Sequence, residues 1–542
     1  MDRSGVAYNL RIVSKHVIIV GGGVGGLAAA VRLAAVGVRV TLLEKNARVG
    51  GKLNLWVAPH PNRPAERPFR FDTGPSLLTM PFVFDQLFEA AGTKLSDHLH
   101  VLRLDPIARY VWPDGSTFEA RARVEDVEDE LKRFAPQDLR GWQQFARRGK
   151  EIWDLAAGMF LFNAPEQLLR GKTDPKSRAG AGLAMLTVPL RIGMFAQFNR
   201  LVNQHVSNRK LREILYQYAT YSGASPFKAP ATLACIPHAE FEFGGWYIEG
   251  GMYRLAEALE RLARSLGAEI HTNAPVSRIL IEDRGHKAHA TGVRLENGEQ
   301  IRADAVVANS DVVYTYRNLI DSSNRIKYND NTLDKLEPGG SGMVLMLGVE
   351  GTYPQLAHHN KLMPIDYRSD LKAMFERQCV PEDPCIYVCA STRTDPSQAP
   401  DGCENLFVLA SAPALGAKID WGIESHRYRD QLVRTLETRF GLKNLNDRIV
   451  VERCLTPVDL QDLYNANRGT IYGIGSNSRR TAFLRPPNRD RDVKSLYFAG
   501  GATHPGGGLP LVALSGKIVS EMVLEDFGVT SPAPANITGS RA

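Results

Sequence analysis

The stretch VIIVGGGVGG, residues 17–26, decides the fold of this chain, because a β-branched run leads directly into a glycine-rich turn. Such a run suits a buried strand. Residues 27–34 (LAAAVRLA) predict a helix, and residues 38–43 (VRVTLL) predict a second strand that closes at Glu44. The order of strand, GxGxxG turn, helix, strand and acid is typical of a dinucleotide-binding unit.

Four residues of this unit carry its predicted chemistry. Gly21 permits the tight turn, Gly23 lets a pyrophosphate approach the backbone, and Gly26 lets the helix pack closely on the strand. Glu44 lies where a carboxylate accepts a hydrogen bond from a ribose hydroxyl. We find no second unit of this kind in the sequence, which therefore predicts a site for one dinucleotide.

A second glycine pair follows the acid, within the stretch KNARVGGK at residues 45–52. This arrangement resembles an extension seen in flavoenzymes of the amine oxidase and carotenoid desaturase superfamily. There the pair, here Gly50 and Gly51, passes close to FAD, and the arginine, here Arg48, supports it. Residues 72–76 (DTGPS) are similar to the next block of those families. The resemblance therefore favours FAD over NAD.

Another glycine-rich turn lies near the far end, in the stretch YFAGGATHPGGGLP at residues 497–510. It predicts a strand, a turn, and a helix that runs from about Pro510 to Glu525. Glycines let backbone approach a ligand closely, and a helix N-terminus offers free N–H groups and partial positive charge. We expect this turn to face a planar electron acceptor.

Composition indicates a globular protein of two or three subdomains. The 542 residues are 44% hydrophobic and 23% charged, with a net charge of +7 and a pI of about 9.0. This mild charge predicts no nucleic-acid partner but suits an anionic membrane surface. The six cysteines lack metal-ligand spacing, so we expect buried thiols and no metal. The polar first fifteen residues predict no signal peptide.

The pieces of the predicted dinucleotide domain are far apart in sequence, so that domain must be discontinuous. The predicted fold class is α/β: a discontinuous Rossmann-like FAD-binding domain of the GR2 type with an inserted mixed sheet and helical substrate domain. The predicted segments are residues 14–100, 236–312 and 485–528 for the FAD-binding domain, 101–235 for a mainly helical substrate and membrane-contact region, 313–484 for a substrate domain with a sheet, and 529–542 for a disordered tail.

Residues 179–202 (AGAGLAMLTVPLRIGMFAQFNRLV) are the most apolar stretch outside the predicted flavin domain. Pro189 and Arg191 interrupt it before it reaches the roughly 20 apolar residues that a membrane span requires. Four basic residues precede it: Arg170, Lys172, Lys176 and Arg178. The pattern fits shallow insertion into a membrane interface and a buried helix pair lining a cavity about equally well.

Four blocks, spread over nearly the whole chain, resemble the bacterial-type carotenoid (phytoene) desaturase family: residues 20–51, 71–76, 244–252 and 496–516. Residues 456–473 add a weaker match. Ala502 and Gly507 depart from the usual family pattern by exchanging one small residue for another. The resemblance implies an FAD-dependent desaturase of an acyclic carotenoid precursor, either phytoene-like or squalene-derived, that acts in carotenoid biosynthesis.

The resemblance also implies which residues contact FAD. They are Gly21, Gly23, Gly26, Glu44, Lys45, Arg48, Gly50, Gly51, Lys52, Thr73, Gly74, Pro75, Val276, Gly500, Gly501, Gly508, Leu509, Pro510 and Leu511. In such a reaction a hydride passes to the flavin N5 and a proton leaves the adjacent carbon. The helix at Pro510 would stabilise negative charge on the reduced flavin.

Four polar residues are candidates for the proton acceptor. His504 lies in the flavin turn, where a bracing role is as well supported as a catalytic one. For His238, Glu240 and Glu242 we favour structural roles. The aromatic residues Phe241, Trp246 and Tyr247 fit either a lipophilic tunnel or plain core.

The implied partners are a long lipophilic polyene, drawn from a membrane, and oxygen or a quinone as electron acceptor. This substrate tips the apolar stretch towards membrane insertion, and we expect a cytoplasmic protein on the inner face of the membrane. Other reactions on the same scaffold stay open: carotenoid isomerisation, oxidation of a terminal methyl group, and retinoid saturation. An amine oxidase and a non-catalytic prenyl-lipid escort protein are further alternatives, and the intact glycines and Glu44 argue against the escort protein.

Overall fold

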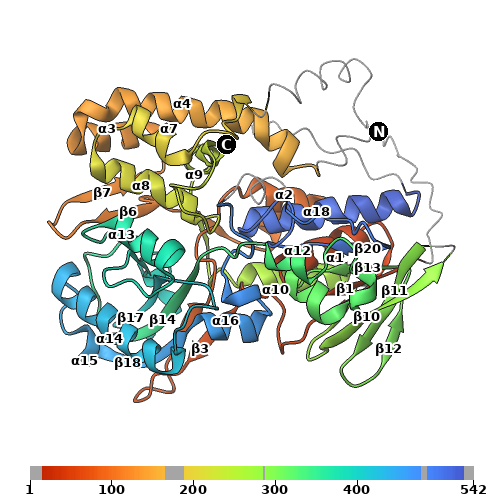
Figure 1. The fold of residues 1–542 in the computed structure, drawn as a ribbon. Helices are drawn as coiled ribbons and strands as arrows, with labels where there is room; N and C mark the ends of the chain where they lie inside the picture. Colours follow the sequence, from red (N-terminus) through yellow and green to blue (C-terminus); the bar gives the residue numbers. More distant parts are fainter. Residues whose placement is uncertain (1–14, 165–187, 189, 285–286, 478–484, 530–542) are drawn as a thin grey trace, which may run out of the picture.

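The computed structural model describes residues 15–164, 188, 190–284, 287–477 and 485–529. Two lobes lie side by side, one around a parallel sheet and the other around a mixed sheet, as Figure 1 shows. The α/β fold class predicted from the sequence is confirmed. Most of the predicted tail, residues 530–542, lies outside the described part of the chain.

The parallel sheet collects five strands from distant parts of the chain. In spatial order they are β20 (Leu496–Phe498), β13 (Ala305–Ala308), β1 (His16–Val20), β2 (Arg39–Leu43) and β9 (Glu269–His271). All four pairings between neighbours are parallel. The strands fall within the three segments assigned to the discontinuous domain, although the boundaries of those segments stay predictions.

Helices cover this sheet because its strands are apolar on both faces. The helices are α1 (Val24–Ala34), α2 (Phe82–Glu89), α10 (Arg254–Ser265) and α18 (Leu509–Asp526). Their apolar residues form one core cluster with strands β1 and β2. A second small sheet packs nearby, made of β10 (Val276–Arg284), β11 (Lys287–Leu295), β12 (Gln300–Arg302) and β19 (Val493–Lys494).

The other lobe is built on a seven-stranded mixed sheet. Its order is β18 (Ile449–Leu455), β14 (Ser341–Glu350), β17 (Cys403–Ala412), β16 (Ile386–Cys389), β15 (His359–Leu362), β6 (Ala108–Val111) and β7 (Thr117–Ala120). Strand β14 is buried along almost its whole length. The apolar runs at 341–349 and 405–409 are neighbours in this sheet.

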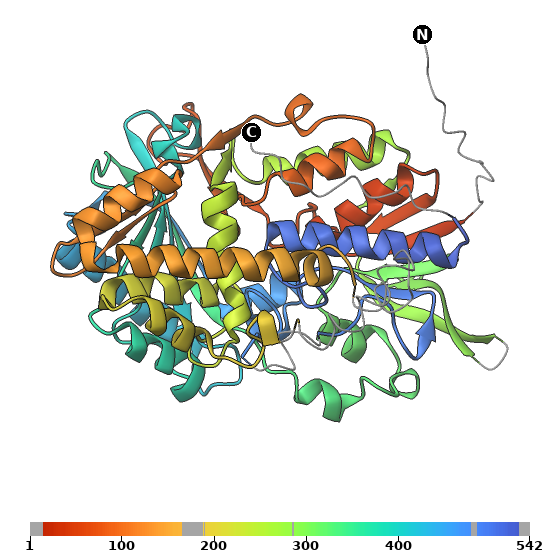
Figure 2. The ribbon, with the colours of Figure 1, turned by 90° about the horizontal axis from the view of Figure 1, so that it is seen from above.

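Helices enclose the second lobe from two directions. Helix α14 (Trp421–Phe440) shares an apolar cluster with β14 and β17. A helical layer lies above β6 and β7 in Figure 1, and Figure 2 shows its longest helix, α4, from above, with α18 on the other lobe. The layer contains α3 (Val124–Phe134), α4 (Leu139–Ala156), α7 (Phe198–His205), α8 (Arg209–Thr220) and α9 (Cys235–Phe243).

Shorter elements join the lobes. Two further antiparallel pairs are β3 (Leu55–Ala58) with β4 (Phe69–Asp72), and β5 (Val101–Arg103) with β8 (Trp246–Ile248). The remaining short α-helices are α11 (Val312–Tyr314), α12 (Asp330–Asp334), α13 (Tyr367–Lys372), α15 (Leu445–Arg448) and α16 (Pro457–Tyr464). No helix of the described residues is both long enough and apolar enough to cross a bilayer.

Helices α1 and α18 make the closest contact between the two ends of the chain. A Cβ atom added at Gly516 would lie 2.5 Å from the Gly25 carbonyl oxygen and 2.9 Å from the Ala28 Cβ. Real Cβ atoms do not approach backbone so closely, so only glycine permits this crossing. The contact fixes the C-terminal turn beside the first glycine turn.

We predict that Gly516→Ala destabilises the protein by about 1–3 kcal/mol, the usual cost of overpacking a filled interior. The variant should also retain less FAD, because the two glycine turns move apart. Thermal unfolding and flavin absorbance measure both effects. Gly158→Ala is the matched control, since an added Cβ there meets nothing within 4 Å. Equal melting temperatures for the two variants would show that the crossing tolerates a side chain.

Candidate functional site

The turn after β1 has a backbone that excludes side chains. Gly21 has φ +101°, and its N–H donates to the Leu43 carbonyl at 2.8 Å. A Cβ at Gly26 would lie 2.3 Å from the Gly21 carbonyl oxygen. Gly23 is the N-cap of α1 and offers no side-chain cap to the helix. The first N–H groups of α1 therefore face an anion-binding concavity.

The second glycine pair lies directly on this turn. The Gly50 N–H donates to the Gly22 carbonyl at 2.8 Å, and a Cβ at Gly51 would lie 3.1 Å from the Gly23 Cα. Gly74 is equally confined, because its Cβ would lie 1.9 Å from the Lys52 carbonyl oxygen. The residues after Gly74, among them Pro75, therefore start from a fixed point beside the two turns.

Glu44 is buried, with 5% of its surface exposed, and both carboxylate oxygens are held. They accept from the Gly22 N–H and the Asn46 N–H, each at 2.8 Å. Each oxygen keeps a further lone pair that a ribose hydroxyl can use. The Ala274 N–H donates to the Glu44 carbonyl at 2.8 Å, which brings the start of β10 and Val276 to the same place.

The basic residues predicted to contact FAD hold backbone in this structure. Lys45 donates to the Asp462 carbonyl at 2.6 Å, and Lys52 donates to the Thr470 and Ile471 carbonyls at 2.8 and 2.7 Å. Burial lowers the pKa of Lys52 to about 8. These amines tie the segment at 462–471 to the dinucleotide end.

Two neighbouring residues make weaker contacts at this end of the site. Arg48 reaches the Leu55 carbonyl at 3.4 Å. The Thr73 hydroxyl lies 3.5 Å from the Tyr464 hydroxyl. Both contacts are long for hydrogen bonds, so they hold these two side chains only weakly.

Asn309 joins the two glycine turns. Its Nδ2 donates to the Gly21 carbonyl at 3.0 Å, and a Cβ at Gly500 would lie 3.0 Å from its Oδ1. Gly500 has φ +101°, so the turn needs glycine for its conformation as well as for space. The sequence patterns indicated no role for Asn309.

The C-terminal turn leads into an uncapped helix. Helix α18 begins at Leu509, one residue before the predicted start, and ends at Asp526. Gly508, at φ +111°, ends the turn as the N-cap, and Pro510 becomes the second helical residue. The N–H groups of Leu509 and Leu511 carry partial positive charge towards the turn. A Cβ added at Gly501 would lie 3.3 Å from the Gly507 Cα, so close packing of these two glycines keeps the turn flat.

These features together fit FAD. The turn at 21–26 would hold the pyrophosphate, Glu44 the ribose, and the turn at 500–511 the flavin ring. The fit rests on confined glycines, a held carboxylate with spare lone pairs, and two uncapped helix N-termini.

His504 is placed as a brace. It is 8% exposed, its Nε2 lies 3.0 Å from the Asn163 carbonyl, and its own carbonyl accepts from Asn488 at 2.8 Å and from Ser515 at 2.9 Å. Burial lowers its pKa to about 4, and the charge of Arg485 acts in the same direction. The imidazole is therefore neutral near pH 7, and its Nε2–H donates to Asn163.

The other candidate acids and bases lie in α9. Glu240 is buried and accepts a hydrogen bond from the Tyr218 hydroxyl at 2.6 Å, and burial raises its pKa. His238 has its pKa lowered by burial, while Glu242 is exposed. The structure brings none of these three into the two glycine turns.

The aromatic residues considered for a tunnel pack into aromatic clusters. Phe241 meets Trp142 edge-on at 5.4 Å between ring centroids, and Tyr247 meets His358 at 4.6 Å. Tyr247 is fully buried. Trp246 is partly exposed and donates to the Phe243 carbonyl at 2.7 Å.

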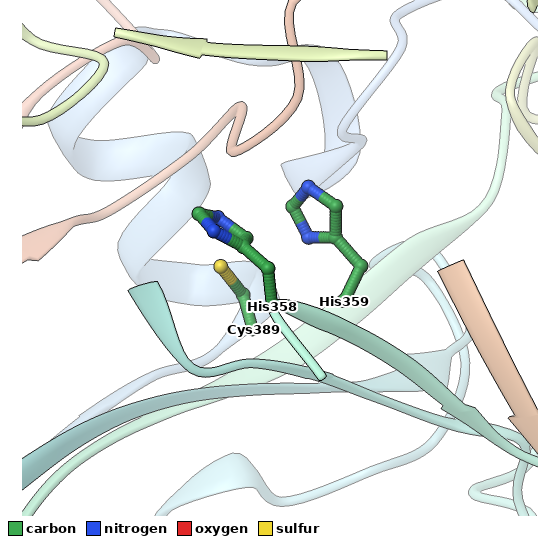
Figure 3. Close-up of side chains that lie close together, drawn as sticks. All are labelled: His358, His359 and Cys389. Carbon is green, nitrogen blue, oxygen red and sulfur yellow. The ribbon is translucent and has the colours of Figure 1, made fainter. Parts of the chain in front are cut away.

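A buried polar group in the mixed sheet was missed by sequence reasoning. His358, His359 and Cys389 have ligand-type atoms within 4.8 Å of one another. Figure 3 shows these three side chains close together. The pairing of β15 with β16 places His359 opposite Cys389. The only signal in the sequence was the adjacent histidine pair, because the cysteine lies on another strand.

Each of these histidines already has a hydroxyl partner. The Nδ1 of His358 lies 2.7 Å from the Thr394 hydroxyl, and the Nδ1 of His359 lies 2.6 Å from the Tyr387 hydroxyl. Burial lowers both histidine pKa values, that of His358 to about 3, and raises that of the Cys389 thiol. Two neutral imidazoles and a thiol are donors suited to a borderline metal ion.

Comparison with known proteins identifies the family. Residues 24–524 match the family described as flavin containing amine oxidoreductase. The chain belongs to this family. The predicted FAD cofactor and the predicted superfamily are confirmed by this match. The flavin oxidoreductase assignment covers nearly all of the described structure.

Two relatives cover the chain almost completely. It is 36% identical to 4,4'-diapolycopene oxygenase of Methylomonas sp over 95% of this chain and 99% of the relative. It is 34% identical to 4,4'-diaponeurosporene oxygenase of Staphylococcus aureus (strain Mu50 / ATCC 700699) over 94% and 98%. An oxidoreductase structure from Methanosarcina mazei shares the fold, with a TM-score of 0.61, 16% identity, and coverage of 93% and 100%.

We predict that His504 makes stability depend on pH. The folded state keeps the imidazole neutral down to a pKa of about 4, whereas the unfolded chain binds a proton near the ordinary value of 6.5. The contribution of His504 to the free energy of unfolding is therefore fully present above pH 6.5. It is lost as the pH falls towards 4, by up to roughly 3 kcal/mol. His504→Gln should flatten this loss in denaturant titrations. The exposed His426→Gln should keep the wild-type slope, and equal slopes for all three proteins would rule out the effect.

Removal of the side chain separates bracing from chemistry. In His504→Ala we expect reduced FAD content, because the Asn163 contact that holds the turn is lost. Turnover normalised to bound flavin should fall by less than about tenfold. Full FAD content with turnover abolished would instead give His504 a direct part in the reaction.

Proposed function

We propose that the protein is an FAD-dependent oxidase of the terminal methyl group of an acyclic carotenoid. One observation carries the proposal: the chain resembles 4,4'-diapolycopene oxygenase over 95% of its own length and 99% of that enzyme's length. The glycine turns, Glu44 and the uncapped α18 needed for FAD are all present along that length. A long lipophilic polyene is the corresponding substrate.

Desaturation is the second candidate, and the carotenoid desaturase resemblance of the sequence motifs supports it. Both reactions begin by removing a hydride from a carbon next to a polyene. They differ in the second step, because desaturation loses a proton and methyl oxidation gains oxygen. The names of the relatives favour methyl oxidation, which the sequence analysis left open as an alternative to desaturation.

The overall chemistry of methyl oxidation balances in two rounds. Conversion of a methyl group to an aldehyde removes four electrons and adds one oxygen atom, so an alcohol is the intermediate product. When bound, FAD supplies the two-electron acceptor for each round. The oxygen atom then comes from water, which adds to the carbon that lost the hydride and releases a proton, and we propose oxygen or a quinone as the final electron acceptor.

The chain's own residues would position the cofactor and stabilise charge on the flavin side of the site. The N-terminus of α18 would stabilise negative charge that develops on the flavin side of the site. Neutral His504 holds the turn without adding a positive charge to it. Asn309 fixes the distance between the pyrophosphate turn and the flavin turn, so the reactive ring and its anchor move as one body.

We further propose that the protein is cytoplasmic and binds peripherally to the inner face of the membrane. Two large apolar side chains support contact with lipid: Leu190 is 68% exposed and Phe195 is 51% exposed. They belong to the apolar stretch at 179–202, most of whose first half lies outside the described residues. In flotation with phosphatidylglycerol vesicles, Leu190→Asp should bind more weakly than Val124→Asp, an equally polar change at a distant exposed site. Equal binding would argue against this surface.

The proposed reaction is tested by the pigments that the protein makes. We expect a bacterial host that accumulates an acyclic polyene, with saturated bonds still beside its conjugated run, to form terminal alcohols and aldehydes when it expresses the protein. Mass spectrometry of the extracted pigments measures the change. A gain of oxygen supports methyl oxidation, whereas loss of two hydrogens without oxygen supports desaturation. An unchanged polyene pool, with flavin bound to the protein, would overturn both.

A further inference from the structure

Lys361 is a cation without an anionic partner in the interior of the molecule. It lies on β15, is only partly accessible, and its Nζ lies 4.6 Å from the ring centroid of Tyr387 and 5.8 Å from that of Tyr221. No salt bridge or hydrogen bond of its ammonium group is found among the described residues. An ammonium has three donors, so this partly accessible group can still donate to a ligand that reaches it.

The charges around Lys361 are felt at a distance and are not paired with it. Glu240 is the carboxylate in its electrostatic surroundings, and its Oε1 is already taken by the Tyr218 hydroxyl at 2.6 Å. Burial lowers the pKa of Lys361, and the charges of Cys385 and Glu240 oppose that shift. The ring faces of Tyr387 and Tyr221 stabilise the cation, but they accept no conventional hydrogen bond.

This group is connected to the flavin end of the site. The Tyr387 hydroxyl lies 2.6 Å from the Ser76 hydroxyl, and Ser76 follows directly on Gly74 and Pro75. Tyr472 lies within the electrostatic surroundings of both Tyr387 and Tyr221. A Cβ at Gly507 would lie 3.2 Å from the Tyr472 Cδ1, so Tyr472 packs directly on the flavin turn.

A hydrocarbon has no acceptor for the three N–H donors of the Lys361 ammonium group. A polyene end without oxygen would leave the ammonium unsatisfied, whereas an alcohol or aldehyde oxygen would accept a hydrogen bond from it. A hydrogen bond to a charged group discriminates strongly between a ligand that has the acceptor and one that lacks it. The lysine therefore suits the oxygenated end of a chain and not the chain itself.

We propose that Lys361 binds the terminal oxygen of an already oxygenated polyene and so determines specificity for the second round of oxidation. This inference rests on the proposed function, because it deepens the choice of substrate. The hydrogen bond between Tyr387 and Ser76 connects this group to the segment that follows Gly74 and Pro75 beside the two glycine turns. Tyr387 and Tyr221 orient the ammonium group, and Ser76 holds Tyr387 in place.

The test compares the hydrocarbon with its terminal aldehyde and alcohol. In Lys361→Met, the ratio of kcat/KM for the polyene alcohol to kcat/KM for the hydrocarbon should fall about tenfold or more. Lys372→Met, an exposed lysine on α13, should leave the ratio at its wild-type value. Flavin absorbance of each variant confirms that it is folded and loaded. Lys361→Arg should restore most of the ratio, because it keeps a charged donor.

A binding measurement separates this inference from the proposed function. The affinity of the purified, oxidised protein in detergent for a polyene aldehyde, relative to that for the hydrocarbon, should also drop about tenfold in Lys361→Met. If the wild type oxidises neither polyene, the proposed function fails and the binding ratio alone decides the role of Lys361. An unchanged ratio in binding or in turnover would overturn the inference.

Discussion

The close crossing of α1 and α18 is the constraint on which the site depends. Gly516 faces the Gly25 carbonyl with no room for a side chain. Asn309 donates a hydrogen bond to the Gly21 carbonyl and packs against Gly500. Because of these contacts, turns from opposite ends of the chain form one surface. Neither turn would define a flavin site alone, since each leaves half of an elongated dinucleotide unsupported.

The rest of the site depends on that alignment. Lys45 and Lys52 hold the segment at 462–471 against the dinucleotide end, which in turn sets Tyr472 beside Gly507. Lys361 lies against the Tyr387 ring in the second lobe, and a pure hydrocarbon substrate does not explain a cation there. An enzyme that creates oxygenated ends has a use for such a partly accessible cation, and this agreement links the flavin chemistry to the second lobe.

Local sequence patterns predicted much of the fold. Features that depend on contacts between distant segments could not be predicted from the sequence. The strand at 17–20, the glycine turns and Glu44 are local features whose backbone geometry only certain residues allow, so their sequence is informative. The start of α18 was predicted one residue late because the N-cap conformation of Gly508 cannot be read from composition. Lys361 and the group of His358 with Cys389 depend on the register of β15 and β16, which no spacing in the sequence reveals. Asn309 was missed for the same reason, since its partners belong to distant turns.

The central claim is that this scaffold passes electrons from a polyene to its flavin. The most direct test is anaerobic mixing of the FAD-loaded protein with an acyclic, fully conjugated polyene in detergent, after which the polyene is extracted and the flavin absorbance and fluorescence are recorded. After the polyene has been removed, we expect the protein to contain reduced flavin in an amount proportional to the oxidised polyene product. Flavin that stays oxidised with both an acyclic hydrocarbon and its terminal alcohol would refute the claim.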